Sequence, residues 1–244
     1  MTSEADGPAA LERMLIVVPT FNERANIGEL VRQIFAQLKD VYVLVVDDYS
    51  PDGTADFVED SSKRYPNLRV LRRTNERGLG RAYTTGILDG LANGFEIIGT
   101  MDADLSHDPA YLPAMLALLR KHDVVIGSRY VPGGGTVNWG VHRRLLSWFA
   151  NKFAATLLRI PAHDITSGYR LYRRRALEQI RINEIKSTGY SFLGELLYRA
   201  YRSGARIAEQ PIIFHDRTNG VSKLHRREIY LGAINLLRLR FSRC

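Results

Sequence analysis

The stretch Met101-Asp102-Ala103-Asp104-Leu105-Ser106-His107 follows a short apolar run, Phe95 to Thr100, which has the β-branched content of a buried strand. Asp108-Pro109 is a turn signal that ends the regular secondary structure directly afterwards. Asp102 and Asp104 are therefore expected at the carboxyl end of a central strand, on one face of it. Ligands of parallel α/β sheets bind at this edge, so both carboxylates are placed to meet one ligand.

These two carboxylates predict a metal site. Neighbouring carboxylates repel each other unless a cation lies between them. Mg²⁺ or Mn²⁺ typically takes one or two carboxylates together with phosphate oxygens of a substrate. The pattern indicates a metal that holds a diphosphate. The alternative is a solvated turn in which Asp104 caps the next helix, and the short motif alone leaves it open.

Two further apolar runs predict parallel strands on the amino-terminal side. Met14 to Val18 is ended by Pro19, and Val41 to Val46 is followed by Asp47-Asp48. Carboxylates at a strand end can accept hydrogen bonds from a ribose or a base.

A helix is predicted between these two strands. Asn26 is its expected cap, and its apolar face is formed by Ile27, Leu30, Val31, Ile34 and Leu38. Further along, Gly78-Leu79-Gly80 precedes another helix, but it lacks the third glycine of the dinucleotide fingerprint.

The alternation of strands and helices continues to the strand Val124 to Gly127 and then stops. It predicts an α/β fold, with a mostly parallel central sheet flanked by helices. The chain has 244 residues, which suits a single domain. Later segments predict a helix from Arg143 to Arg159 and a strand from Ala208 to Phe214.

The amino-acid composition of the chain excludes several classes of protein. The single cysteine is Cys244, which excludes a disulfide framework and a cysteine-based zinc site and favours a reducing cytoplasm. No apolar stretch approaches the roughly 18 to 20 residues of a spanning helix. The first residues lack the pattern of a signal peptide.

The net charge of +8 is unevenly distributed along the chain. Residues 1–110 carry 11 Lys and Arg against 18 Asp and Glu, whereas residues 111–244 carry 23 against 8. A basic half suits nucleic acid, an anionic membrane or a phosphorylated substrate. The chain has no zinc-finger spacing, basic repeat or RNA-binding aromatic motif, so no nucleic-acid partner is predicted.

Seven motifs occur in the order seen in dolichol-phosphate mannosyltransferases, and the chain resembles this family from about residue 14 to 225. They are Pro19-Thr20-Phe21-Asn22-Glu23, the strand end at Asp47-Asp48, Gly78-Leu79-Gly80, Asp102-Ala103-Asp104, Ser128-Arg129-Tyr130, Ser167-Gly168-Tyr169 and Arg217-x-x-Gly220-x-Ser222-Lys223. These enzymes are inverting family 2 glycosyltransferases. The resemblance implies a nucleotide-diphosphosugar transferase fold, which is GT-A-like and Rossmann-like.

The resemblance also implies roles for individual residues. Pro19, Phe21, Glu23 and Asp48 match the nucleoside site, and Asp102 and Ala103 lie with them in the donor site. Arg217 and Lys223 match groups that close over the donor diphosphate. Asp102 and Asp104 match the metal site, and Ser106, which stands where some relatives have glutamine, is placed with them. Arg129, Arg143 and Ser147 match the acceptor-phosphate site, and Asp104, Arg129 and Arg143 are expected to act in catalysis.

The activity implied is inverting transfer of mannose from GDP-mannose to a polyprenyl or dolichyl phosphate, with Mg²⁺ or Mn²⁺, for glycan assembly. Two alternatives are a polyprenyl-phosphate glucosyltransferase that uses UDP-glucose and a non-catalytic sugar-nucleotide-binding protein. The chain resembles short members of the family that adhere to the cytoplasmic face of a membrane or are held there by small membrane subunits.

Residues 1–13 are expected to be disordered, residues 14–225 to form the catalytic domain, and residues 226–244 to form a basic amphipathic helix. The helix from Arg143 to Arg159 is also basic and amphipathic, with Leu145, Leu146, Phe149, Phe153, Leu157 and Leu158 as its apolar residues. In the tail, the recurring apolar residues are Ile229, Ala233, Leu236, Leu237 and Phe241. Either helix, or both, is expected to contact an anionic membrane surface. The alternative is that each packs on its own domain.

Overall fold

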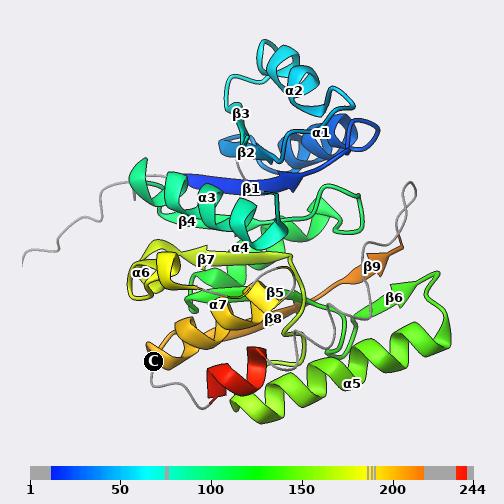
Figure 1. The fold of residues 1–244 in the computed structure, drawn as a ribbon, viewed down its shortest axis with the longest axis vertical. Helices are drawn as coiled ribbons and strands as arrows, with labels where there is room; N and C mark the ends of the chain where they lie inside the picture. The colour runs from blue at the N-terminus through cyan, green and yellow to red at the C-terminus, as the bar shows by residue number, and fades with distance from the viewer. Residues whose placement is uncertain are drawn as a thin grey trace, which may run out of the picture.

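A seven-stranded, mostly parallel sheet forms the centre of the computed structural model, which describes residues 12–74, 77–185, 187, 189, 191–216 and 235–240 (Figure 1). The strand order is β3-β2-β1-β4-β7-β5-β8. The strands are β1 (Met14–Thr20), β2 (Val41–Asp47), β3 (Leu68–Arg72), β4 (Ile97–Thr100), β5 (Val124–Ser128), β7 (Arg170–Arg173) and β8 (Ile207–Pro211). The predicted fold class is confirmed.

Helices cover both faces of this sheet. They are α1 (Ile27–Gln37), α2 (Thr54–Ser62), α3 (Leu79–Ala92), the 3₁₀ turn η1 (Pro109–Tyr111), α4 (Leu112–Leu119), α5 (Val141–Leu158), α6 (Arg174–Glu178), the 3₁₀ turn η2 (Ile182–Glu184) and α7 (Ser191–Arg202). Apolar side chains of α1, α2 and α4 pack in one cluster, and those of α3, α5, α6 and α7 pack in another. Alternate residues of β1 serve the two clusters, Leu15 and Val17 in one and Ile16 and Val18 in the other.

The predicted end of the first strand at Pro19 is wrong, because β1 continues through Pro19 to Thr20. Pro19 has no N–H to donate, and it is tolerated because β4 pairs with β1 only as far as Val17. On its other side Pro19 lies opposite Val46 of β2. The strand therefore carries the chain further along the ligand-binding edge than the sequence pattern indicated.

The strand β7 is antiparallel to both of its neighbours, β4 and β5. It enters the sheet between two strands that are parallel to the rest. Just before it, Thr100 donates its hydroxyl to the carbonyl of Gly168, over 2.7 Å. This insertion brings the segment from Asp164 to Tyr169 beside the carboxyl end of β4.

The predicted strand from Ala208 to Phe214 is divided between two sheets. Residues Ile207–Pro211 form β8 in the main sheet, and Ile213–His215 form β9, which pairs with β6 (Gly135–Val137). Pro211 ends β8 because proline has no backbone N–H to donate to a neighbouring strand. In Figure 1, β6, β9 and α5 extend from the main sheet on the side where β1 ends. This side also holds the loop after β4.

The predicted helix from Arg143 to Arg159 is present as α5, which begins two residues earlier. Asn151, Ala154 and Leu158 face the core. The opposite face exposes large apolar side chains, namely Val141, Leu145, Leu146, Trp148, Phe149 and Phe153. Packing on the domain therefore accounts for Ala154 and Leu158 but not for the exposed apolar residues of this helix.

The tail behaves differently from α5. Residues 235–240 are helical, Leu239 is 6% exposed, and Leu236 packs against the core beside Gly194 of α7. Leu237 is exposed. The remainder of the predicted tail helix, residues 226–234 and 241–244, lies outside the described residues, as do residues 1–11. Among the helices that the structure describes, none has the length and apolarity needed to span a bilayer.

Candidate active site

Asp102 lies in the loop that directly follows β4, as its position after an apolar strand predicted. Its Oδ1 accepts a hydrogen bond from the hydroxyl of Tyr83 on α3, over 2.7 Å. A Cβ on Gly168 would lie 3.0 Å from the same oxygen, so glycine is the residue that lets this loop approach the carboxylate. The position of Asp102 thus depends on α3 and on the segment before β7.

Asp104 is buried beside Ser106. The Ser106 hydroxyl and backbone N–H donate to Oδ1 of Asp104, over 2.5 and 3.1 Å. Asp104 therefore bonds within its own turn, and the helical turn η1 is capped instead by Asp108, which accepts from the N–H of Ala110. The alternative in which Asp104 caps the next helix is wrong. Ala103, between the two aspartates, is buried.

The donor set fits a divalent cation. No three His, Cys, Asp or Glu side chains gather as metal ligands anywhere in the described ranges. Asp102 and Asp104 still offer hard carboxylate oxygens, and the structure assigns Oδ2 of Asp102 no hydrogen-bond donor among the described residues. Mg²⁺ and Mn²⁺ commonly take one or two carboxylates and complete their shell with substrate phosphates. The metal-ligand role of Asp102, Asp104 and Ser106 stays a prediction.

His107 is a site residue that sequence analysis did not single out, although it ends the stretch around the two aspartates. Its Nδ1 accepts the N–H of Asp102 over 3.2 Å, and its ring packs on Tyr169 and Phe214. Burial lowers the pKa of His107, so the ring is neutral near pH 7 and can accept at Nδ1. His107 thereby holds the backbone of the aspartate loop.

Asp48, predicted to hold the nucleoside, directly follows β2 and lies at the ligand-binding edge of the sheet. Its carboxylate pairs with Arg73 and accepts the N–H of Gly78 over 2.7 Å, which ties the end of β2 to the turn before α3. Burial raises the pKa of Asp48. The neighbouring Asp47 accepts the hydroxyl of Thr20 instead. The Gly78 turn therefore approaches a carboxylate rather than forming a dinucleotide loop.

Phe21 and Glu23 lie in the loop after β1, at the same edge of the sheet as Asp48. The guanidinium of Arg77 lies 4.5 Å from the centroid of the Phe21 ring. Glu23 accepts the side-chain N–H of Asn26 over 2.9 Å. Asn26 occupies the N-cap position of α1 as predicted, but its side chain makes no capping hydrogen bond and donates to Glu23 instead. The predicted nucleoside residues Pro19, Phe21 and Glu23 thus share the edge with Asp48.

Arg129 follows β5, and it is nearly fully buried. Its Nε and Nη2 donate to the two oxygens of Asp164, each over 2.7 Å, and Nη2 also donates to Thr166. Burial alone would lower the pKa of Arg129, but Asp164 outweighs burial and raises it, and the negative charge of Asp102 contributes as well. The third nitrogen, Nη1, makes no hydrogen bond to the described residues.

Arg143 on α5 reaches the same region from the opposite side. Its Nη1 lies 2.9 Å from Oδ1 of Asp216, and its guanidinium carbon lies 4.0 Å from the centroid of the Trp139 ring. The guanidinium of Arg129 lies 5.5 Å from the same ring. The two arginines of the predicted acceptor site therefore flank one indole. The buried indole N–H of Trp139 has no partner among the described residues.

Phe214 connects the acidic and the basic parts of this edge. Its ring contacts His107 at 5.4 Å and Trp139 at 5.3 Å between centroids, and the Arg129 guanidinium lies 5.3 Å from it. Sequence analysis passed over Trp139 and Phe214, since an aromatic residue in a loop or a strand carries no signal of its neighbours. Together these contacts place the predicted acceptor arginines beside the aspartate loop.

Ser147, the third predicted acceptor residue, lies one turn along α5 from Arg143 and accepts the hydroxyl of Tyr130 over 2.7 Å. Tyr130 directly follows Arg129 in the chain. Arg217 and Lys223, predicted to close over the donor, lie outside the described residues.

An α/β sheet with carboxylates and arginines at its ligand-binding edge suits an enzyme of phosphorylated substrates, and a glycosyltransferase is one such class. The chain belongs to glycosyl transferase family 2, whose family profile matches residues 15–181. It is 40% identical over 226 residues to the undecaprenyl-phosphate mannosyltransferase of Micrococcus luteus, and the match covers 93% of each chain. It is 43% identical over 215 residues to the polyprenol monophosphomannose synthase of Mycolicibacterium smegmatis, covering 87% of this chain and 81% of that one.

The fold is also similar to solved structures. Glucosyl-3-phosphoglycerate synthase from Mycobacterium tuberculosis, in complex with Mn²⁺, uridine diphosphate and phosphoglyceric acid, superposes with a TM-score of 0.68 at 18% identity. The match covers 94% of this chain and 79% of that one. At this identity the likeness concerns the fold alone. The predicted family and the predicted single GT-A-like domain are confirmed.

Proposed function

We propose that this enzyme transfers mannose from GDP-mannose to the phosphate of a polyprenyl phosphate, with inversion at the sugar. The observation that carries the proposal is that the rings of His107, Phe214 and Trp139 connect the loop of Asp102 and Asp104 with Arg129 and Arg143. A site for two phosphorylated substrates needs carboxylates for the metal of one and arginines for the anion of the other. Relatives at 40% and 43% identity carry names that agree with mannose as the sugar and a polyprenyl phosphate as the acceptor.

The donor occupies the acidic side of the edge in this proposal. Asp48, Glu23 and Phe21 surround the nucleoside, and Asp102 and Asp104 would hold Mg²⁺ or Mn²⁺ with the diphosphate. The cation, when bound, stabilises the negative charge of the leaving diphosphate. Tyr83 and His107 keep Asp102 in place through its side chain and its backbone. Ser106 orients Asp104 by its hydrogen bonds.

The acceptor phosphate lies between Arg129 and Arg143. Arg129 already uses two of its nitrogens on Asp164, so it presents Nη1 at a fixed position. Arg143 is 42% exposed and must exchange its bond with Asp216 for one to the phosphate. Ser147 adds a hydroxyl beside Tyr130. Guanidinium groups suit this task because they donate several hydrogen bonds to phosphate oxygens.

A phosphate oxygen attacks the anomeric carbon while the bond from that carbon to the diphosphate breaks on the opposite face, so GDP leaves and the configuration inverts. The second pKa of a phosphomonoester is about 6, and the nucleophile is therefore largely anionic at neutral pH without a protein base. The remaining barrier is electrostatic, since two anions must approach each other. The arginines reduce this repulsion.

We also propose that α5 rests on the cytoplasmic face of an anionic membrane. Leu145, Phe149 and Phe153 form part of its exposed apolar face, and Arg144, Lys152 and Arg159 are exposed on the same helix or at its end. This pattern suits a helix lying in the headgroup region. Packing of Leu236 and Leu239 on the core makes residues 235–240 the weaker candidate. Small membrane subunits remain predicted partners.

The decisive experiment is a donor panel with a short-chain polyprenyl phosphate, with lipid-linked sugar as the product measured. GDP-mannose is expected to support transfer, whereas UDP-glucose and GDP-glucose are not. Preferential turnover of UDP-glucose would replace the proposal with the glucosyltransferase alternative. Donor binding without transfer to any polyprenyl phosphate would favour a non-catalytic sugar-nucleotide-binding protein.

A further inference from the structure

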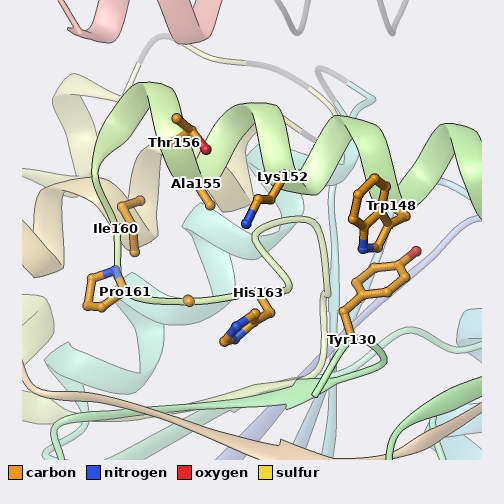
Figure 2. Close-up of a pocket in the computed structure, with 9 residues that line it drawn as sticks. Tyr130, Trp148, Lys152, Ala155, Thr156, Ile160, Pro161 and His163 are labelled. Carbon is orange, nitrogen blue, oxygen red and sulfur yellow. The ribbon is translucent and has the colours of Figure 1, made fainter. Parts of the chain in front are cut away.

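A cavity of about 310 Å³ lies beneath the second half of α5, between this helix and the chain that follows it (Figure 2). One wall comes from α5, another from residues 160–163, and Tyr130 lines one end. Figure 2 shows the ring of Tyr130 beside Trp148, with Ile160 and Pro161 at the opposite end. A cavity of this size is at the lower limit of small-molecule sites, which begin at about 300 Å³.

The lining of this cavity is mainly apolar. Trp148 and Ala155 line it from α5, and Ile160 and Pro161 line it from below. The side chain of Lys152 also projects into it (Figure 2). A lysine can cover apolar surface with its stem while its ammonium group stays in water. The lining therefore suits a hydrocarbon group with a polar group at one end.

A carboxylate beside the cavity disfavours an anionic occupant. His163 lines the cavity, and its Nδ1 lies 2.8 Å from Oε2 of Glu209. The backbone N–H groups of His163 and Asp164 also donate to this carboxylate, whose side chain is only 8% exposed. Glu209 lies behind His163 rather than in the lining, and its negative charge counters the attraction of Lys152 for a phosphate in the cavity. An uncharged hydrocarbon is affected by neither charge.

The cavity lies between the predicted phosphate site and the exposed apolar face of α5. At one end, the hydroxyl of Tyr130 donates to Ser147, one of the predicted acceptor-phosphate residues. At its outer side, Trp148 lines the cavity and is also 45% exposed beside Leu145 and Phe149. A lipid whose phosphate lies near Ser147, and whose chain extends towards a membrane in contact with α5, would pass along Trp148 and the cavity that it lines.

We propose that the cavity binds the isoprene units nearest the phosphate of the polyprenyl acceptor. The inference rests on the proposed acceptor and adds a subsite that selects for an isoprenoid chain. Because the first units are held by Trp148, Ala155 and Ile160, the phosphate is oriented as well as bound. The remainder of the chain leaves over Trp148 towards the apolar face of α5.

The main test fills the cavity with Ala155→Leu, which suits a helix because leucine is almost as good a helix former as alanine. Thr156→Leu is a second filling variant, and Ala117→Leu on the exposed side of α4 is the matched control. Mannosyl transfer is measured with phosphates that carry one, two or three isoprene units. Filling is expected to raise the acceptor KM about tenfold and to reduce the gain from added units. The donor KM and thermal unfolding should match the control.

A binding experiment tests the subsite independently of transfer. Trp148 fluorescence is followed while a short polyprenol without phosphate is added, and Trp148→Phe gives the background from Trp139. The signal is expected to saturate in the wild type and to be lost in Ala155→Leu. Lys152→Met is expected to tighten polyprenol binding, because the cavity becomes more apolar.

Two results would overturn the inference. One is an unchanged acceptor KM and chain-length dependence in both filled variants. The other is a response to inorganic phosphate that Lys152→Met abolishes, with no response to polyprenol, which would make the cavity an anion site. Saturable polyprenol binding in an enzyme that mannosylates no polyprenyl phosphate would support the subsite and reject the proposed function.

Discussion

Arg129 and Asp164 form a buried, two-pronged ion pair between the end of β5 and the segment that leads into β7. The two residues are 35 positions apart, and Asp164 also accepts the backbone N–H of Arg129 over 3.0 Å. Two hydrogen bonds from the guanidinium and one from the backbone N–H thus fix Arg129 before any substrate arrives. The pair turns a flexible side chain into a rigid part of the site.

Asp164→Asn should destabilise the protein, because it leaves the buried charge of Arg129 without its partner. Loss of one member of a buried pair typically costs about 3 to 5 kcal/mol of the free energy of unfolding. Burial would raise the pKa of Asp164, but Arg129 outweighs burial and lowers it. The stabilisation is therefore present above about pH 4, the ordinary aspartate value, and is lost as the pH falls through the lower folded value. Denaturant unfolding between neutral and acid pH measures both effects.

The control for this variant is Asp60→Asn, which removes an exposed pair with Lys63 and should leave the free energy of unfolding almost unchanged. Equal stability of Asp164→Asn and Asp60→Asn would contradict a structural role for the buried pair.

Asp102→Asn and Asp104→Asn should each lower transfer by at least about 100-fold, because each replaces a charged oxygen ligand that helps to stabilise the leaving diphosphate. Metal-dependent donor binding, measured by calorimetry with Mg²⁺ or Mn²⁺, should weaken in both. Turnover near the wild-type level in EDTA would reject the metal site.

Gly168→Ala should reduce activity with little loss of stability. The added Cβ would lie 3.0 Å from Oδ1 of Asp102 and 3.2 Å from the Tyr83 hydroxyl, so the carboxylate must shift. A loss of roughly 10- to 100-fold is expected, since a misplacement of about 1 Å can cost 100-fold. Gly194→Ala is the control, because its Cβ meets neighbours only at 3.5 Å. Equal kinetics in the two variants would show that Asp102 tolerates the shift.

Arg143→Ala should act on the acceptor. Removing a charge-assisted hydrogen bond is expected to raise the acceptor KM or lower turnover by about 10- to 100-fold, with donor affinity almost unchanged. Arg143→Lys should recover only part of the loss, since an ammonium group lacks the planar fork. Steady-state kinetics with each substrate varied separately gives the answer. The opposite pattern would assign Arg143 to the donor diphosphate.

Leu145→Ser combined with Phe149→Ser should weaken binding to anionic vesicles by at least about tenfold, because each large apolar side chain is worth about 1.5 to 3 kcal/mol when buried. Co-sedimentation at low and high salt measures this, and salt should weaken wild-type binding by screening the basic residues. Leu237→Ser is the matched control. If deletion of residues 228–244 abolishes binding and the double variant binds normally, α5 is not the membrane contact.

The sequence by itself determined which segments are buried strands, which carboxylates end them, and how unevenly the charge is distributed. Apolar runs before Asp48 and Asp102 sufficed for this, because strand burial and strand ends are local properties of the chain. The motifs also sufficed for the family. The amphipathic pattern located α5 within two residues, but periodicity records an apolar face without recording what covers it.

The tertiary structure alone decided which residues of the site contact one another. Only folding brings Asp164 to Arg129, Gly168 to Asp102, and Phe214 between His107 and Trp139, because these pairs are set by the antiparallel insertion of β7 and by the division of β8 from β9. It also decided that Leu236 and Leu239 pack on the core whereas Phe149 and Phe153 are exposed. Burial depends on which surfaces remain uncovered after the sheet and helices have packed, and no local pattern contains that information.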